Sequence, residues 1–255
     1  MRAVATTLLF ALAAAGQQPD PIIESARADA ARYVRSIPNY IVSRTTTRFH
    51  AIPHRRQPIS DWHKIDTVSA EVANQDNRES YSSIEIDGKP SKALPQAGVW
   101  SNGEFSLLLD EILNPKHHAI FTARAADDVD SRLAWRYNFT IDAKHSGWNM
   151  AADAGLFRRM YVAPSYSGSI WIDQATGKVL RIEKSTHSTP HSFPIGTVEA
   201  STGYSPVEIG GETYMLPTHS QTITCRRDNT ECFRNETVFE NYRKFEADAT
   251  ITYSK

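Results

Sequence analysis

The chain has 255 residues with 40% apolar side chains, and its five Trp, ten Tyr and ten Phe supply enough large side chains for a sizeable core. This composition excludes a globally disordered chain, and the length fits one large β domain. A formal net charge of −1, with the signs interspersed, gives no electrostatic basis for binding nucleic acid or an anionic membrane surface.

The first segment has the layout of a cleavable secretory signal. Arg2 precedes an apolar run from Ala3 to Ala15, and small residues stand at Ala13 and Ala15. We therefore expect residues 1–16 to be a signal peptide, residues 17–255 to form one domain, and the mature protein to be periplasmic or secreted. A buried N-terminal helix is the alternative reading. No window approaches the roughly 20 apolar residues of a membrane span, so no transmembrane segment is expected.

Two segments show helical periodicity. Asp20 is a good N-cap with Pro21 at the first helical position, and this helix should end before Pro38. The second helix lies in NGEFSLLLDEILNP and is stopped by Pro115. The apolar stripes consist of Ile22, Ile23, Ala26, Ala30, Tyr33, Val34 and Ile37 in the first helix, and of Phe105, Leu108, Leu109, Ile112 and Leu113 in the second. Each stripe must be buried against another element.

Elsewhere the apolar residues recur with period two, which predicts strands. In RLAWRYNFTID the residues that share one face are Leu133, Trp135, Tyr137, Phe139 and Ile141. Weaker alternation occurs in YIVSRTTTRF, KIDTVSAEV, YSSIEI, HAIFTARA, THSQTITC and CFRNETVFENYRKF. Asp87-Gly88 is a hairpin-turn signal. Eight or more strands joined by short turns predict a large antiparallel sheet.

The segment YSGSIWIDQATGKVLRIEKSTHS predicts a hairpin with two unlike faces. A turn over residues 174–177, with Gly177 in the left-handed conformation, sets the register. Ile172 should then lie opposite Leu180 and Ile170 opposite Ile182, which makes one face aliphatic. The other face carries Ser169, Trp171, Asp173, Arg181 and Glu183, with Trp171 opposite Arg181 in a cation–π pair.

Two cysteines flank a second turn signal. Cys225 and Cys232 enclose RRDNTE, in which Asp228-Asn229 should form a hairpin tip. In an oxidising compartment we expect these cysteines to form a local disulfide. A metal site is the alternative, although a second pair of ligands is missing from this spacing.

The predicted fold class is mainly β (α+β). An antiparallel sheet that is apolar on one face needs a cover, and two amphipathic helices are available. Because two helices hardly tile eight to ten flat strands, we expect a strongly curved sheet that forms an open half-barrel around them. Its interior would be either a packed core or a cavity.

Several stretches together resemble a known family. They are the leading helix, PNYIVSRTTTRF, GEFSLLLDEIL, YSGSIWIDQATGKVLRIE and NETVFENYRKFEADATITY. Over about residues 20–253 the chain resembles the periplasmic outer-membrane lipoprotein-sorting (LolA/LolB-like) superfamily, in particular its secreted bacterial branch. The resemblance implies a half-barrel whose concave face shelters hydrophobic groups such as acyl chains. The same superfamily includes periplasmic stress-sensing regulators, so the fold leaves the function open.

The sequence shows no catalytic signature. His50 and His54, like His187 and His191, are four residues apart, but Pro and Ser/Thr disrupt any helix there, so no metal site is expected. No G-x-S-x-G motif and no Gly-rich phosphate loop occurs. We therefore expect no enzyme activity and no cofactor.

These observations predict a non-catalytic protein that binds a hydrophobic ligand, either a lipid or an acylated protein. The expected lining residues are Leu133, Trp135, Tyr137, Phe139, Ile170, Ile172, Leu180 and Ile182, with Leu108 and Ile112 as a lid. The alternative for the aromatic row is simple core packing. The alternative function is an interaction or sensory module with a filled core, which binds a protein partner.

Overall fold

The computed structural model describes residues 20–53, 59–75, 78–95, 106–153 and 159–245. The signal peptide expected at residues 1–16, Phe105 of the second helix and His54 lie outside the described residues, and the side chain of Val34 is not described either. The boundary at residue 17 therefore stays a prediction.

The described part is mainly β, with two α-helices. The helices are α1 (Pro21–Ser36) and α2 (Ser106–Leu113), and the 3-10 turns are η1 (Pro115–His117) and η2 (Ala143–His145). The strands are β1 (Tyr40–Ala51), β2 (His63–Gln75), β3 (Arg78–Ile86), β4 (Lys89–Pro90), β5 (Ile120–Val129), β6 (Arg132–Ile141), β7 (Met150–Asp153), β8 (Arg159–Val162), β9 (Tyr166–Asp173), β10 (Val179–Thr186), β11 (Ile195–Ile209), β12 (Glu212–Arg226) and β13 (Cys232–Lys244).

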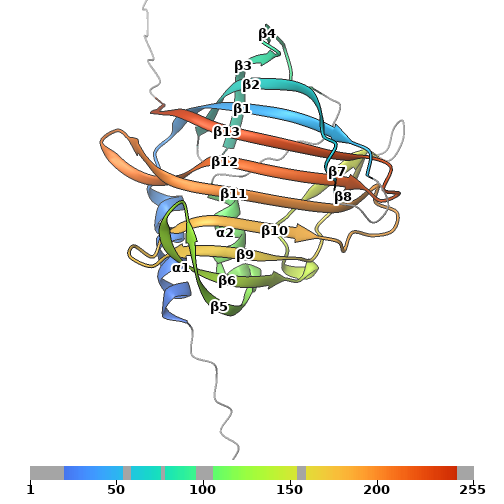
Figure 1. The fold of residues 1–255 in the computed structure, drawn as a ribbon. Helices are drawn as coiled ribbons and strands as arrows, with labels where there is room; N and C mark the ends of the chain where they lie inside the picture. Colours follow the sequence, from blue (N-terminus) through green and yellow to red (C-terminus); the bar gives the residue numbers. More distant parts are fainter. Residues whose placement is uncertain (1–19, 54–58, 76–77, 96–105, 154–158, 246–255) are drawn as a thin grey trace, which may run out of the picture.

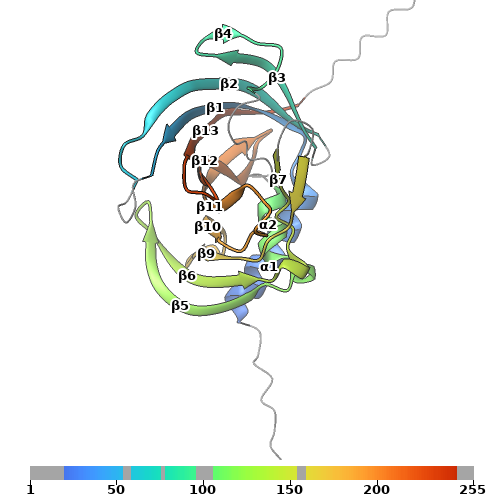
Figure 2. The ribbon, with the colours of Figure 1, turned by 90° about the vertical axis from the view of Figure 1, so that its right-hand side faces the viewer.

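One large antiparallel sheet dominates the molecule, as predicted. Eleven strands lie in the order β4-β3-β2-β1-β13-β12-β11-β10-β9-β6-β5, while β7 and β8 form a separate pair. The sheet is not closed, because its edge strands β4 and β5 do not pair with each other. It is twisted, so that its two ends bend away from the plane of the central strands (Figures 1 and 2). The first and last long strands, β1 and β13, are neighbours in its middle.

Both helices cover the same face of the sheet. The Asp20 Oδ1 atom accepts a hydrogen bond of 2.9 Å from the Ile22 amide, and α1 ends before Pro38, as predicted. The two helices pack against each other behind the strands (Figure 1). The buried stripe residues that join one cluster with the sheet are Ile23, Ala26, Ala30 and Tyr33 from α1, and Leu108, Leu109, Ile112 and Leu113 from α2.

The covered face is not apolar along its whole length, which corrects the expectation of one apolar side. On β1 this face begins with Tyr40 and Val42, which belong to the apolar cluster, and continues with Arg44, Thr46 and Arg48. All three polar residues are buried. Arg48 forms two hydrogen bonds with Asp66 of β2, from Nε to Oδ1 at 2.7 Å and from Nη2 to Oδ2 at 2.5 Å. The inner face is therefore divided into an apolar part and a polar part.

The β9–β10 hairpin has most of the predicted register. Ile170 lies opposite Ile182 and Trp171 opposite Arg181, whose guanidinium carbon is 5.4 Å from the indole centroid. Gly177 has φ +70°, as the predicted turn requires. The pairing of Ile172 with Leu180 is wrong by one residue: Ile172 pairs with Val179, because the register shifts between Val179 and Arg181.

Two further turn predictions are confirmed. Asp87 and Gly88, where a hairpin turn was predicted after β3, have φ values of +49° and +74°, which fits a type I′ turn. Cys225 and Cys232 pair across β12 and β13 and form a disulfide, and Asn229 at the hairpin tip has φ +55°. The disulfide closes the end of the hairpin that runs through the middle of the sheet.

Asp173 fixes the turn between β9 and β10. Its Oδ1 atom accepts hydrogen bonds from the amide and the hydroxyl of Thr176, both at 2.7 Å, and its Oδ2 atom lies 3.0 Å from the guanidinium of Arg132. Burial alone would raise the pKa of this carboxyl, but the hydrogen bonds from Thr176 and the charge of Arg132 together lower it. The ionised carboxylate therefore stabilises the folded state.

We predict that Asp173→Asn lowers the free energy of unfolding at neutral pH by about 1–3 kcal/mol, because charged hydrogen bonds are lost in a buried place. The pKa of Asp173 is lower in the folded than in the unfolded chain, where it is about 3.9. The stabilisation is therefore present above that pH and is lost as the pH falls through the folded value. Urea unfolding at neutral and acidic pH should show a smaller acid-induced loss for the variant than for the wild type.

The exposed Asp153 on β7 provides the control. Asp153→Asn should leave the free energy of unfolding within about 0.5 kcal/mol of the wild type. An identical pH profile for wild type and Asp173→Asn would contradict the role given to Asp173.

Candidate functional site

The structure brings most of the predicted lining residues into a packed core. Eight of the ten are buried members of the apolar cluster: Tyr137, Phe139, Ile170, Ile172, Leu180, Ile182, Leu108 and Ile112. Trp135 is half-buried and packs against the cluster. Leu133 is 68% exposed, because it begins β6 beside the turn, beyond the edge of the cluster. In the described state the eight buried side chains belong to one packed cluster, and Phe139 alone among the ten also borders one of the two hollows described below.

A cavity of about 200 Å³ lies at the seam between the helices and the sheet. Its lining comes from α1, Leu109 of α2, the start of β10, and β11 and β12. The mostly apolar side chains at this seam are Ala26, Ala30, Leu109, Val179, Tyr204 and Met215, and the charged ones are Asp29, Arg32, Lys178 and Glu212. None of the ten predicted residues is among them. The cavity is thus amphipathic, with charged side chains beside an apolar wall.

Tyr33 of α1 gives this cavity a polar atom. Its hydroxyl is buried and makes no hydrogen bond within the described part of the chain. Burial, with the nearby phenols of Tyr40, Tyr204 and Tyr242, raises the pKa of Tyr33 well above its usual value, so the hydroxyl stays protonated. An unpaired buried hydroxyl costs free energy, and an acceptor atom on a ligand could satisfy it.

A buried ion pair ties α2 to the sheet. The Nζ atom of Lys184 on β10 lies 3.1 Å from Oε2 of Glu111 on α2, and both side chains are about nine-tenths buried. The ammonium also lies 4.0 Å from the ring centroid of Trp148 and 5.5 Å from that of Tyr166. Burial, and then the Glu111 carboxylate, raise the pKa of Tyr166 far above its ordinary range. The pair and the apolar stripe together hold α2 in place.

The carboxylate of Asp110 forms hydrogen bonds that stabilise the C-terminal end of α2. Asp110 accepts hydrogen bonds from Asn114 at 2.7 Å and from Lys116 at 2.6 Å. Burial alone would raise the pKa of Asp110, but these partners, with His117 nearby, lower it. The carboxylate is consequently ionised at neutral pH and links α2 to η1.

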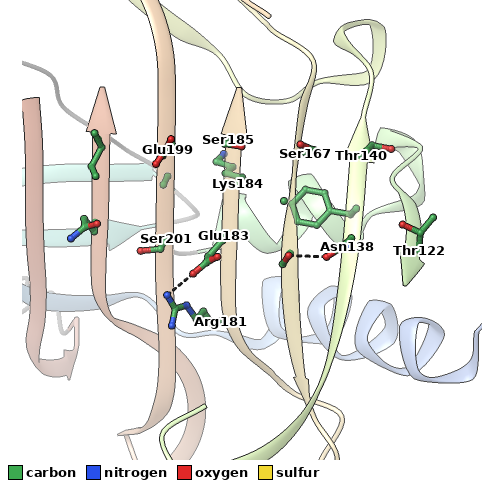
Figure 3. Close-up of a pocket in the computed structure, with 16 residues that line it drawn as sticks. Thr122, Asn138, Thr140, Ser167, Arg181, Glu183, Lys184, Ser185, Glu199 and Ser201 are labelled. Atoms are coloured by element: carbon green, nitrogen blue, oxygen red, sulfur yellow. Dashed lines mark hydrogen bonds and ion pairs between the residues drawn. The ribbon is translucent and has the colours of Figure 1, made fainter. Parts of the chain in front are cut away.

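A larger hollow lies on the opposite, uncovered face of the sheet. It has a volume of about 690 Å³ and crosses β5, β6, β9, β10, β11 and β12 (Figure 3). We call it the outer groove. Its lining residues are Thr122, Asn138, Phe139, Thr140, Ser167, Gly168, Ser169, Arg181, Glu183, Lys184, Ser185, Glu199, Ala200, Ser201, Gln221 and Ile223. Sequence reasoning placed Ser169, Arg181 and Glu183 on this face but did not identify a site there.

Within the described residues, no group of three or more His, Cys, Asp or Glu side chains is placed to hold a metal ion. The same part of the chain contains no helix that is both long enough and apolar enough to cross a membrane.

Comparisons with known proteins returned distant structural matches alone: no family model and no curated protein matched. A LolA superfamily protein from Nitrosomonas europaea is 12% identical, covers 92% of this chain and 96% of its own, and has a TM-score of 0.32. A DUF1329 family protein from Desulfovibrio piger is 12% identical over 90% of this chain and 95% of its own, with a TM-score of 0.34. MucB, from a complex with MucA, is 9% identical, covers 89% of this chain and 99% of its own, and has a TM-score of 0.23.

The resemblance noted from the sequence is thus found again, since a LolA superfamily protein is among these matches. TM-scores below 0.5 do not establish a shared fold. The ligands and partners of these proteins therefore say nothing about the sites of this chain.

We predict that the Lys184–Glu111 pair behaves as a coupled unit. Lys184→Met alone should destabilise the protein by about 3–5 kcal/mol, because it leaves a buried carboxylate without its counter-charge. The double variant Lys184→Met/Glu111→Leu should be more stable than Lys184→Met. Urea unfolding of the four members of this cycle measures the coupling.

The exposed pair of Arg32 and Asp29 on α1 is the matched control, with a distance of 2.8 Å. Breaking it with Asp29→Ala should cost at most about 1 kcal/mol. Simple additivity of the Lys184 and Glu111 substitutions would contradict the coupling.

Proposed function

We propose that this chain is an exported, non-catalytic binding protein that takes a hydrophobic ligand, a lipid or a lipoprotein acyl chain, between its two helices and the apolar part of the sheet. The observation that carries the proposal is the amphipathic cavity at the helix–sheet seam. In this proposal the sheet is an open half-barrel and the two helices are its removable cover.

The chemistry of the seam suits an amphiphile. Burying an acyl chain gains about 0.8 kcal/mol for each methylene that leaves water. Ala26, Leu109 and Met215 offer apolar contact, while Lys178 offers positive charge for a polar head. The unpaired Tyr33 hydroxyl can donate to an ester or carboxyl oxygen of the ligand.

The size of the cavity implies that a long ligand moves α2. A volume of 200 Å³ is below the roughly 300–1,000 Å³ of most ligand pockets. The helix α2 has eight residues and is held to the sheet by its apolar stripe and the Lys184–Glu111 pair. Displacing it would uncover the buried members of the predicted set, among them Ile170 and Ile182. Those residues are therefore proposed as the floor for a longer chain.

A second function has one observation in its favour. The eight buried residues of the predicted set already fill the space under the helices. In an interaction or sensory module this filled core would be permanent, and a protein partner would dock elsewhere.

Lipid mass spectrometry separates the two functions. The mature protein, from about residue 17, is purified from its native compartment without detergent. A stoichiometric co-purified lipid supports the carrier function. A protein that carries no lipid and takes up no fluorescent fatty acid supports the interaction module.

We predict that Ala30→Leu weakens binding of a fluorescent fatty acid at least about tenfold, because the added side chain fills the cavity that Ala30 lines. Ala28 lies on the exposed side of the same helix, so Ala28→Leu is the matched control and should leave binding unchanged. Fluorescence titration measures affinity, and the melting temperature shows that both variants are folded. Equal binding by the two variants would contradict this site.

A further inference from the structure

The outer groove lies on the opposite face from the helices because side chains alternate along each strand. Ile170 and Ile182 belong to the cluster under the helices, so their neighbours Ser169, Arg181 and Glu183 point to the groove. Figure 3 shows Arg181 and Glu183 in this position. Its floor is backbone at Gly168, where a Cβ atom would lie 1.9 Å from the carbonyl oxygen of Glu183. The same Cβ atom would lie 2.8 Å from the ring of Phe139, so residue 168 has to be glycine.

The groove is unusually rich in groups that both donate and accept hydrogen bonds. Six hydroxyl and two amide side chains line it: Thr122, Thr140, Ser167, Ser169, Ser185, Ser201, Asn138 and Gln221. Ser169 donates to Oδ1 of Asn138 at 3.0 Å. Hydroxyl and amide groups together can match a ligand that presents many hydroxyls.

Among the described residues, the charges in and around the groove are paired except for that of the exposed Glu199. Arg181 is paired with Glu183, and neighbouring Arg136 lies 3.8 Å from Asp127. The indole N–H of Trp171 donates to Asp127 at 3.0 Å and lowers the pKa of that carboxyl, so it remains ionised beside Arg136. The ammonium of Lys184, although its residue lines the groove, is engaged by Glu111 on the other face. An anionic ligand such as a phosphate or a nucleic acid finds no cluster of unpaired cations here.

The groove also lacks the anchors of a protein interface. Hot spots of protein interfaces are enriched in Trp, Tyr and Arg. Among the described lining residues the one aromatic side chain is Phe139, which is 1% exposed and belongs to the opposite face. Trp171 is buried, its ring stacks with the guanidinium of Arg181, and its indole N–H donates to Asp127. The lining therefore disfavours both an apolar ligand and a typical protein partner.

The dimensions suit an extended oligomer. The volume of 690 Å³ falls within the roughly 300–1,000 Å³ of ligand pockets. The six adjacent strands that line it span five inter-strand distances, or about 24 Å. A ligand lying across the strands would meet side chains from each of them.

We propose that the outer groove is a second binding site, separate from the helix–sheet seam, for a neutral polyhydroxylated ligand of the oligosaccharide class. The observations that carry it are the eight hydroxyl and amide side chains, the pairing of both cationic lining residues with carboxylates, and the size of the hollow. The ligand would replace the water on these groups with hydrogen bonds of similar quality.

The test uses the mature protein and defined probes: soluble cello-oligosaccharides, malto-oligosaccharides and oligomers of N-acetylglucosamine, measured by calorimetry. At least one series should bind, with affinity that rises with chain length. Ser169→Leu and Ser201→Leu, on β9 and β11, should each weaken that binding at least about tenfold by filling the groove. The matched control is Ser69→Leu on β2, outside the groove lining, which should keep the wild-type affinity.

A surface variant keeps the test decisive if a leucine variant is unstable. Glu199 is exposed and lines the groove, so Glu199→Gln should preserve the fold and shift the saccharide affinity measurably, by a few-fold. Failure of all three saccharide series to bind would overturn the proposal. So would a cationic peptide that binds the wild type and is lost with Glu199→Gln. Binding of the fluorescent fatty acid, which probes the helix–sheet seam, should be unchanged in every groove variant. The proposed function and the proposal of a second site can therefore be contradicted separately.

Discussion

The register of the β9–β10 hairpin ties the two faces of the molecule together. With Ile170 opposite Ile182, the aliphatic side chains meet the helices, and Arg181 and Glu183 must then face outward. A slip of one residue would bury an Arg–Glu pair and expose isoleucine. The turn that Asp173 stabilises therefore also determines which side chains of β9 and β10 face the helices and which face the solvent. The same backbone alternation sets the wall of the helix–sheet seam and the lining of the outer groove.

The polar part of the inner face limits where a hydrophobic ligand could lie. Beyond Val42 the inward side chains of β1 are Arg44, Thr46 and Arg48, and the Arg48–Asp66 pair is buried. An acyl chain packed against that pair would remove the two charges further from water, which costs free energy. Thr46 and Thr237 share a hydrogen bond of 2.9 Å in the same region. The apolar surface available to a ligand is thus the part that the two helices cover.

Local signals in the sequence were sufficient where a short segment determines its own conformation. Asp20-Pro21 and Pro38 define α1, Asp87-Gly88 defines a turn, and the two cysteines lie across a hairpin. The bulge near Val179 was not predictable, because it depends on how β10 also pairs with β11. The polar part of the inner face could not be predicted either, because the linear sequence does not show that Arg48 of β1 pairs with Asp66 of β2. Neither cavity could be found from periodicity, since a volume is what remains after elements from distant parts of the chain have packed.

The pairing of β1 with β13 has a consequence for how the chain acquires its structure. Thr46 and Thr237 are 191 positions apart, and Tyr137, at 2.9 Å from Asp20, is 117 positions from its partner. Such distant contacts make the chain a slow folder, because long loops must close before the contacts form. The middle of the sheet cannot be completed until the last strand is available. A newly synthesised chain would consequently remain unfolded for most of its synthesis, which is the state that the proposed export through a narrow translocation channel would require.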